Sequence, residues 1–385
     1  MVTASRPRSG SEVAGFVLQP EAPLSTAFRE AVGEVVARFV DGQAPALEAM
    51  GPELRPVRRM AATLLQGGKR LRPAFCVWGY VAAAGLPGAH ASADDVAPLL
   101  RVAASLDLLH VSALVHDDVM DSSDLRRGQP AAHRQFEGQH AAAGWLGDAA
   151  TFGRAGAILL GDLLLMWSTE LLQRSGMDGA ALARATPVAE AMRTEVTCGQ
   201  YLDIVAQAQP LGADVRLALD EAERVVEYKS ARYTVQRPCQ LGAALGGGDD
   251  RLQASLAAYG SPVGRAFQFR DDVLGVFGDS EVTGKPAGDD LREGKRTVLV
   301  AHAYAGAGAA GRDLLERRLG DPDLDAAGVA DLQAVIVEAG ALAAVEAMIE
   351  DGYGRALAVL ESAEMDDDGR RGLASLAEAA VRRQF

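Results

Sequence analysis

The sequence predicts an all-α protein, folded as one large bundle of helices. From about residue 24 onward, Ala and Leu dominate and apolar residues recur at spacings of three and four, which is the period of a helix. Gly or Pro interrupts this pattern at intervals that suit helix ends. No segment alternates apolar and polar residues in the manner of a strand, so we expect no sheet.

Six segments exemplify the expected helices. In chain order they cover residues 27–40, 97–119, 153–173, 188–206, 218–245 and 252–277. Several are apolar on nearly every side, which is typical of helices buried in a large bundle. Segments 246–250, 305–311 and 364–371 are expected to be loops. Residues 1–20 are polar and are expected to form a loose tail, and no change in composition divides residues 21–385, which we interpret as one domain.

The composition excludes several classes of protein. The chain has 385 residues, of which 49% are hydrophobic and 23% are charged, so it is not mainly disordered. Its net charge of −14 would repel a nucleic acid or an anionic bilayer, and we expect no nucleic-acid partner. Charges interrupt the apolar runs before they reach about 20 residues, so we also expect no stable membrane insertion.

The cysteines and lysines are informative because they are few. Three well-separated cysteines with no CxxC pair are typical of reduced thiols, and the N-terminus lacks an apolar secretion signal, so we expect a cytoplasmic protein. Only four of the 38 basic residues are lysines. When arginine is used at almost every other basic position, the lysines that remain mark places where a compact ammonium group is required. The four are Lys69, Lys229, Lys285 and Lys295.

Two of the acidic pairs are unusual. The acidic runs at 94–95, 249–250, 289–290 and 366–368 lie in polar surroundings, where helix caps or solvated loops explain them. Asp117-Asp118 and Asp271-Asp272 instead lie in apolar helical segments. Carboxylates are costly there unless ions or cations compensate them.

The first pair begins the segment DDVMD, residues 117–121. Asp117 and Asp121 are four residues apart, so a helix presents both carboxylates on one face. Two oxygen donors on one face suit Mg²⁺, which keeps several waters and bridges to substrate phosphates. Arg126 and Arg127 follow, and guanidinium groups can bind the remaining oxygens of a diphosphate. This segment predicts a site for a magnesium-chelated diphosphate.

Further segments carry cations in patterns that suit phosphates. In GGKRLRP, residues 67–73, two glycines precede Lys69 and Arg72, although the spacing is not that of a Walker loop. Lys229 lies in an apolar helical segment. After the second acidic pair, Lys285 and Lys295 lie in Gly-rich connections that could close over a phosphate.

Together these motifs resemble those of the trans-polyprenyl diphosphate synthases, and most of all geranylgeranyl diphosphate synthases. The resemblance rests on GGKRLRP, LLHVSALVHDDVMDSSDLRRGQP, GQYLD, YKSA and FQFRDD followed by two GK segments, and it extends from about residue 24 to the C-terminus. It implies the all-α isoprenoid synthase fold with a central cavity, a homodimer, and three magnesium ions per active site.

The resemblance also implies the reaction. Isopentenyl diphosphate would add to the carbocation formed from an allylic diphosphate (dimethylallyl, geranyl or farnesyl), giving a linear all-trans prenyl diphosphate. The residues that match the isopentenyl diphosphate site are Lys69, Arg72, His110 and Arg127. Those that match the allylic site are Arg126, Lys229, Ser230, Gln268, Lys285 and Lys295. The matching metal-site residues are Asp117, Asp118, Asp121, Asp271 and Asp272, and the residues implied to be catalytic are Asp117, Asp121, Asp271 and Lys229.

One position departs from the family pattern. The second motif ends in Gly275, where the family commonly has a third aspartate. In the family this carboxylate acts mostly through metal-bound water, so we expect the site to tolerate its loss and a Gly275→Asp variant to change the rate only modestly. Asp279 is a candidate substitute.

Product length is expected to depend on side chains one to two turns before Asp117. Ser112 and Ala113 are small, where short-chain synthases of the family carry an aromatic plug, and Leu109 narrows the tunnel without clearly sealing it. These residues predict a C20 product, geranylgeranyl diphosphate, with longer polyprenyl products as the alternative.

Two other functions compete with this interpretation. A class I terpene cyclase also ionises a diphosphate, but the sequence lacks its downstream N-D-x-x-S-x-x-x-E triad. A non-catalytic partner subunit of a heteromeric synthase would lose residues of the aspartate motifs, whereas both pairs are intact here apart from Gly275.

Overall fold

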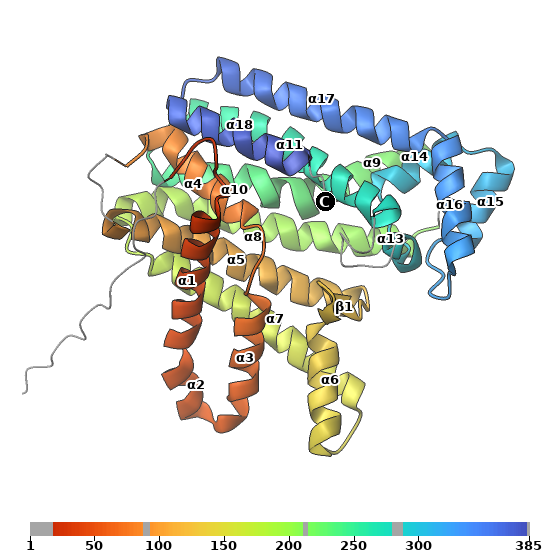
Figure 1. Cartoon of the computed structure of the whole chain (residues 1–385), viewed down its shortest axis with the longest axis horizontal. Coiled ribbons are helices and arrows are strands. Elements are labelled where there is room, and N and C mark those ends of the chain that lie inside the picture. Colours follow the sequence, from red (N-terminus) through yellow and green to blue (C-terminus); the bar gives the residue numbers. More distant parts are fainter. Residues whose placement is uncertain (1–17, 88–92, 211–214, 279–287, 383–385) are drawn as a thin grey trace, which may run out of the picture.

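The computed structural model describes residues 18–87, 93–210, 215–278 and 288–382 and confirms the predicted all-α fold (Figure 1). Residues 1–17 of the expected tail lie outside the described residues. The first helices are α1 (Thr26–Gly42), α2 (Ala44–Met50), η1 (Pro52–Leu54), α3 (Arg55–Leu64), α4 (Leu71–Ala84), α5 (Ala93–Met120), α6 (Ala132–Ala143), α7 (Ala149–Gln173) and α8 (Gly179–Ala208). They are followed by α9 (Val215–Val225), η2 (Val226–Gln236), α10 (Arg237–Leu245), α11 (Asp250–Phe277), α13 (Asp289–Glu293), α14 (Val298–Gly306), α15 (Ala309–Arg318), α16 (Ala326–Glu338), α17 (Ala341–Ser362) and α18 (Asp367–Val381).

Five of the six exemplified helices are present as single elements, namely α1, α5, α7, α8 and α11. The sixth, residues 218–245, is divided into α9, the π-helix η2 and α10. A π-helix accommodates an extra residue per turn and is frequent at functional sites. Lys229, which the resemblance implies to bind substrate, lies within the π-helix η2.

The expected caps and loops are largely confirmed. Asp249 caps α11 by accepting a hydrogen bond from Leu252 N at 2.9 Å, and Asp366 caps α18. Residues 246–249 connect α10 to α11 as predicted. The loops expected at 305–311 and 364–371 are shorter, because α15 begins at Ala309 and α18 at Asp367.

The expectation of no sheet needs one correction, a two-stranded hairpin after α5. Strands β1 (Leu125–Arg126) and β2 (Gln129–Pro130) pair antiparallel, with Arg126 opposite Gln129. The two turn residues, Arg127 and Gly128, have φ angles of 53° and 71°. Positive φ at both central residues is characteristic of a type I′ turn, which suits the twist of a two-residue hairpin. The hairpin holds the arginine pair close to the end of α5.

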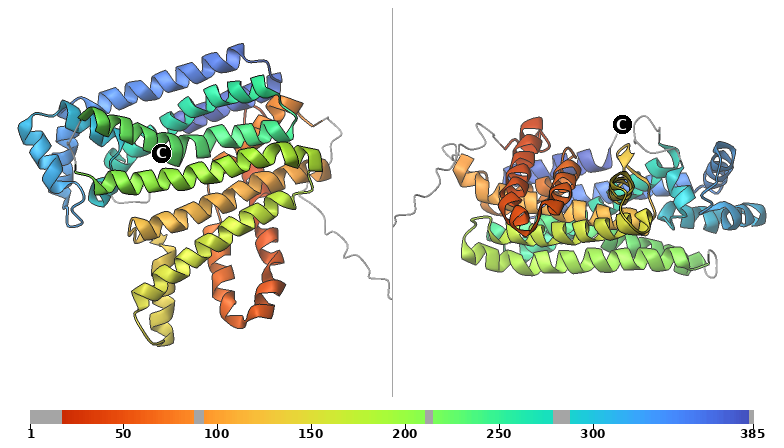
Figure 2. Two further views of the ribbon diagram at one scale, coloured as in Figure 1. Left: turned by 180° about the vertical axis from the view of Figure 1, so that it is seen from behind. Right: turned by 90° about the horizontal axis from the view of Figure 1, so that it is seen from below.

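The long helices pack side by side in two connected sets (Figures 1 and 2). One set contains α5 packed on α7 and α4, and the other contains α8, η2, α11 and α17, each packed on the next. Two clusters of buried residues form the core. The larger cluster includes Trp78, Phe75 and Leu108, and the smaller one lies among α11, α14, α16 and α17.

Two helices remain apolar over most of their length despite the charges that interrupt them. By length and composition, Asp95–Met120 of α5 and Ala149–Gln173 of α7 could each cross a membrane, and the bent pair α16 and α17 could form a third span. The most apolar part of α5 is 72% buried inside the protein, whereas that of α7 is only 44% buried. Helix α7 therefore leaves an apolar face uncovered.

Candidate active site

The first acidic motif lies at the C-terminal end of α5, where polar side chains from two other helices donate hydrogen bonds to it. Lys229 Nζ of η2 lies 3.1 Å from Asp117 Oδ1, and Gln200 Nε2 of α8 donates to the same oxygen at 3.0 Å. The helical hydrogen bond from Asp121 N to Asp117 O, 2.8 Å long, continues the helix through the motif. The predicted arrangement of both carboxylates on one helix face is thus present in the structure.

Lys229 is fixed by close packing of α8 against η2. A Cβ atom added at Gly199 would lie 2.3 Å from Lys229 N, so only glycine permits this approach. The lysine also donates to Asp203 Oδ2 at 2.6 Å. Burial alone would lower the pKa of Lys229, but Asp117 and Asp203 raise it overall, so the side chain remains an ammonium group.

The pKa values of Asp117 and Asp121 are shifted in opposite directions. Burial acts to raise the pKa of Asp117, but the charges of Lys229, Lys295 and Arg126 outweigh it and lower the pKa. For Asp121, burial and the neighbouring charge of Asp117 raise the pKa to about 6. Asp121 is therefore the carboxylate of the pair that most needs a further cation.

Lys295 connects the first motif with the segment after the second. Its Nζ lies 3.7 Å from Asp121 Oδ2, 3.5 Å from Asp290 Oδ1 and 2.5 Å from Glu293 Oε2. These acidic neighbours raise the pKa of Lys295 although burial acts to lower it. The expectation that the pair 289–290 is a cap or a solvated loop was wrong for Asp290, whose side chain is 14% exposed.

In the second motif, Asp272 is buried and Asp271 is half-buried. Gln268 donates to Asp272 Oδ1 at 2.8 Å, so it contacts this carboxylate in addition to any role at a diphosphate. Burial raises the pKa of Asp272 to about 8, with further contributions from Asp290 and Asp271. Lys285 and Asp279 lie outside the described residues.

The donor chemistry fits magnesium bound together with a substrate. Oδ2 of Asp121 and Oδ2 of Asp272 are both buried and accept no hydrogen bond from the described residues. Buried carboxylate oxygens without donors are costly, and a divalent cation compensates them. No group of three or more His, Cys, Asp or Glu within the described residues forms a ready metal cage. Mg²⁺ characteristically binds through few carboxylates plus waters and phosphates, which agrees with this arrangement.

Asp118 does not face the same space. Its side chain is 4% exposed and accepts hydrogen bonds from Nε and Nη2 of Arg126, the former at 2.8 Å. In this structure Asp118, implied to be a metal ligand, pairs instead with Arg126 and holds it beside Asp117. The separation between Arg126 Nη2 and Asp117 Oδ2 is 3.7 Å.

Arg72 and His110 both contact Tyr233 of η2. The Arg72 guanidinium lies 4.2 Å from the centre of the Tyr233 ring and donates to Thr234 Oγ1 at 2.8 Å. His110 Nδ1 lies 3.0 Å from the Tyr233 hydroxyl. Burial and the charges of Arg72 and Arg127 hold the pKa of His110 well below its usual range, so its ring is neutral at pH 7. Arg72 and His110 are thus brought together as predicted.

The glycine loop and the hairpin adjoin. Arg127 Nη1 donates to the Gln66 carbonyl at 3.3 Å, and its Nη2 would lie 3.5 Å from a Cβ at Gly68. Lys69 is exposed in the same loop. Arg70, which the sequence analysis did not single out, is buried and pairs with Asp107 Oδ2 at 2.6 Å.

The structure separates the residues expected to control product length. The Ser112 hydroxyl donates to the Gly161 carbonyl of α7 at 2.7 Å, so this side chain lies in the contact between α5 and α7. Ala113, four residues before Asp117, is half-buried on the motif's side of the helix. Leu109 is 3% exposed. Ser112 therefore faces α7, and Ala113 faces the side of α5 that carries Asp117.

Sequence reasoning missed several side chains at the site. Gln200 and Asp203 belong to the GQYLD motif, residues 199–203, to which the sequence analysis assigned no role. Asp290 and Glu293 lie in the segment between the two GK motifs, where acidic residues beside a lysine were the available signal. Ser230 is half-buried next to Lys229.

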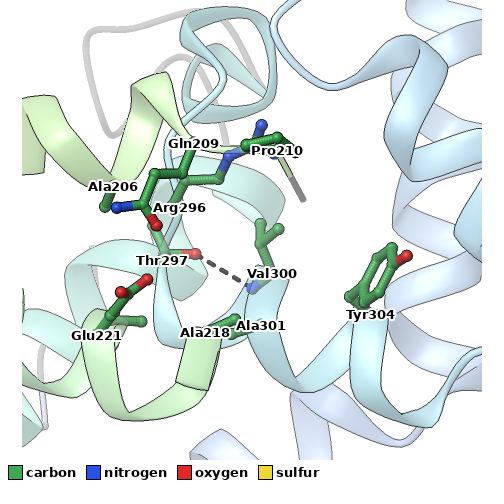
Figure 3. Close-up of a pocket in the computed structure, with 11 residues that line it drawn as sticks. Ala206, Gln209, Pro210, Ala218, Glu221, Arg296, Thr297, Val300, Ala301 and Tyr304 are labelled. Atoms are coloured by element: carbon green, nitrogen blue, oxygen red, sulfur yellow. Dashed lines mark hydrogen bonds between the residues drawn. The ribbon is translucent and has the colours of Figure 1, made fainter. Parts of the chain in front are cut away.

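The pocket in Figure 3 is separate from the aspartates. It encloses about 490 Å³ of empty space, open solvent included, between the ends of α8 and α9 and the start of α14. None of its lining residues belongs to an aspartate motif, although Arg296 directly follows Lys295. It is therefore not the expected central cavity.

Comparisons with known proteins identify the family of the chain. The family model described as polyprenyl synthetase matches residues 55–336. A short chain isoprenyl diphosphate synthase of Methanothermobacter thermautotrophicus is 32% identical over 319 residues, which are 83% of this chain and 87% of that protein. A geranylgeranyl diphosphate synthase of Methanosarcina mazei is 32% identical over 67% of this chain and 71% of its own length.

A solved structure is similar over nearly the whole chain. The geranylgeranyl pyrophosphate synthase of Corynebacterium glutamicum, complexed with isoprenyl diphosphate and magnesium, superposes with a TM-score of 0.86 at 37% identity. The superposition covers 93% of this chain and 99% of that one. The confirmed all-α fold is accordingly the isoprenoid synthase fold, and the chain belongs to the polyprenyl synthetase family of trans-prenyltransferases.

Proposed function

We propose that the protein is a magnesium-dependent synthase that condenses isopentenyl diphosphate with an allylic diphosphate. The observation that carries this proposal is the pair of cation groups around the acidic motifs. Lys229 and Lys295 lie beside Asp117 and Asp121, whereas Arg72 and His110 contact Tyr233 and Arg127 lies at the glycine loop. Two diphosphates can therefore be held apart, one with metal and one without.

The allylic diphosphate would be ionised at the first group. Asp117, Asp121 and Asp271 would help to hold three Mg²⁺ ions, whose charge would stabilise the leaving diphosphate. Lys229 is kept charged by Asp117 and Asp203, so it adds a fixed cation on the same side. Arg126, oriented by Asp118, donates to the remaining oxygens.

Isopentenyl diphosphate would be held at the second group. Arg72 is oriented by Thr234 and Tyr233, and Arg127 by its position above the glycine loop. Neutral His110 adds a hydrogen bond rather than a charge. This placement would bring the isopentenyl double bond to the allylic cation, and proton loss then completes a product five carbons longer. The apolar helix walls would exclude the water that quenches a carbocation.

Purified protein supplied with Mg²⁺, isopentenyl diphosphate and an allylic diphosphate tests the proposal. A linear prenyl diphosphate, sized by chromatography, is the expected product. A cyclic hydrocarbon would show a cyclase, and no turnover would show a non-catalytic partner subunit. We further propose that the enzyme acts in the cytoplasm, since Cys76, Cys198 and Cys239 are all free thiols.

We propose geranylgeranyl diphosphate, C20, as the main product, because Ala113 leaves room for a chain to pass along α5. An Ala113→Phe variant is expected to shift the main product to C15 or C10, since the ring would fill space one turn below Asp117. Product analysis by chromatography measures the shift. Ser112→Phe should instead disrupt the contact with Gly161 and lower the melting temperature. Wild-type product length from a folded Ala113→Phe variant would contradict this path.

We propose that the protein is a homodimer formed through α7. This helix exposes Ile158, Leu159 and Met166, which are 44%, 68% and 65% exposed. Leu159 and Met166 are seven residues apart and therefore lie on one stripe of the helix, which Ile158 borders, and a second copy packed about a two-fold axis would cover both stripes. The uncovered apolar window of α7 agrees with this arrangement.

A Leu159→Glu variant is expected to become a monomer, because two buried carboxylates would face each other at the two-fold axis. Light scattering after size-exclusion chromatography measures the mass. Val337→Glu on α16, where the side chain is 52% exposed, is the control and should leave the mass unchanged. A Leu159→Glu variant that remains dimeric would place the interface elsewhere.

A further inference from the structure

A carboxylate from another helix occupies the space above Gly275. A Cβ atom built on this glycine would lie 1.9 Å from Oδ2 and 2.5 Å from Cγ of Asp290. No side chain can be accommodated at position 275 while Asp290 keeps this position. The position that commonly carries the third aspartate of the motif is therefore small, and an aspartate from α13 lies against it.

Asp290 is held firmly in this position although α13 is short. The next residue, Leu291, is fully buried, and its carbonyl accepts a hydrogen bond from Gly320 N at 2.9 Å. Arg292 Nε donates to the Leu324 carbonyl at 2.9 Å. The contacts of α13 with the α15–α16 region thus fix the segment that carries Asp290.

The Asp290 carboxylate also belongs to the space between the two motifs. Its Oδ1 lies 3.5 Å from Lys295 Nζ, and the same Nζ lies 3.7 Å from Asp121 Oδ2. Its charge contributes to the raised pKa of Asp272. Asp290 is accordingly close to both acidic motifs.

A buried and unpartnered oxygen at this place points to a cation. Asp272 is 4% exposed, and its Oδ2 accepts no hydrogen bond from the described residues. Gln268 serves only the other oxygen, Oδ1. Burying several carboxylates together is costly unless a cation is bound among them.

We propose that Asp290 supplies the carboxylate that Gly275 lacks, acting toward the hydrated magnesium at the second motif. Gly275 and Asp290 form a matched pair, in which the absence of a side chain at one position allows the carboxylate at the other. The inference rests on the proposed function. It also reverses the expectation for Gly275→Asp, because the new side chain would displace Asp290 and add a charge beside it.

Magnesium binding separates this pairing from a structural role. Isothermal titration of Mg²⁺ into protein with inorganic pyrophosphate is made for four variants: Asp290→Ala, Gly275→Asp, the double variant, and Asp289→Ala. Each single change at 290 or 275 is expected to weaken Mg²⁺ binding about tenfold. The double variant, in which the carboxylate returns to position 275, should bind within about threefold of wild type. Asp289→Ala removes a neighbouring charge and should bind as wild type does.

The outcomes separate the two proposals. Wild-type protein that neither binds Mg²⁺ with pyrophosphate nor forms product would overturn the proposed function itself. Wild-type protein that does both, with Asp290→Ala binding Mg²⁺ equally well, would overturn only the role of Asp290. If either single variant fails to fold by circular dichroism, the double variant decides, because weak binding by the folded double variant would refute the pairing.

Discussion

Replacing Asp117 or Asp121 with alanine is expected to lower turnover by roughly three orders of magnitude or more while leaving the fold intact. Both carboxylates lie on one face of α5 beside Lys229 and Lys295, where they would hold the metal that acts on the leaving group. Steady-state kinetics at saturating Mg²⁺ measures the loss. It should appear mainly in kcat, because ionisation of the allylic substrate is the step affected.

The fold is expected to survive because each lysine keeps another partner. Without Asp117, Lys229 still donates to Asp203 at 2.6 Å, and without Asp121, Lys295 remains 2.5 Å from Glu293. Circular dichroism and the melting temperature check this point. Asp124→Ala is the matched control, since Asp124 follows the motif but is 61% exposed and pairs with Arg134. Near-wild-type turnover in either motif variant would refute the metal assignment.

The order of helices could be predicted from the sequence because apolar periodicity is a local property. The segments assigned to α1, α5, α7, α8 and α11 lie within the observed helices. The π-helical geometry of η2 could not be predicted, since it depends on the close packing of η2 against Gly199 of α8 and Gly264 of α11. The hairpin was missed because strands of two residues carry no periodic signal.

The site could be predicted by motif but not by side-chain direction. Adjacent helical residues point about 100° apart, so a small uncertainty in helix rotation exchanges the faces of Ser112 and Ala113. The same rotation turns Asp118 toward Arg126 and away from Asp117. Asp290 was assigned to a cap or loop because its proximity to Gly275 depends on contacts between distant segments. Local pattern contains no information about such a contact.

The pair formed by Arg70 and Asp107 is expected to be the largest single electrostatic contribution to the stability of the glycine loop. Arg70 stands at the N-terminus of α4 with a φ angle of 54°, and its guanidinium donates to Asp107 Oδ2 at 2.6 Å and to the Leu65 carbonyl at 2.9 Å. Both side chains are 7% exposed. A buried guanidinium that loses its carboxylate cannot regain hydration without opening the loop.

Asp107→Ala is therefore expected to lower the free energy of unfolding by about 3–5 kcal/mol, measured by denaturant titration. The control is Asp41→Ala, which breaks a pair with Arg58 of similar length, 2.9 Å, whose aspartate is 73% exposed. That change should cost no more than about 1 kcal/mol. If both variants lost the same free energy of unfolding, burial would not make the Arg70–Asp107 pair more important for stability than an exposed pair.

A double variant separates two contributions to the free energy of unfolding: the cost of leaving one buried charge without its partner, and the net stabilisation by the ion pair itself. Burial raises the pKa of Asp107 even with Arg70 beside it, so desolvation of the carboxylate outweighs the attraction of the nearby arginines. Arg70→Met with Asp107→Leu removes both charges and is expected to unfold within about 1 kcal/mol of wild type or to be more stable. Because Arg70 lies between Lys69 and Arg72, Asp107→Ala should also raise the KM for isopentenyl diphosphate more than that for the allylic substrate. An unchanged ratio of the two KM values would mean that the pair stabilises the fold without orienting the glycine loop.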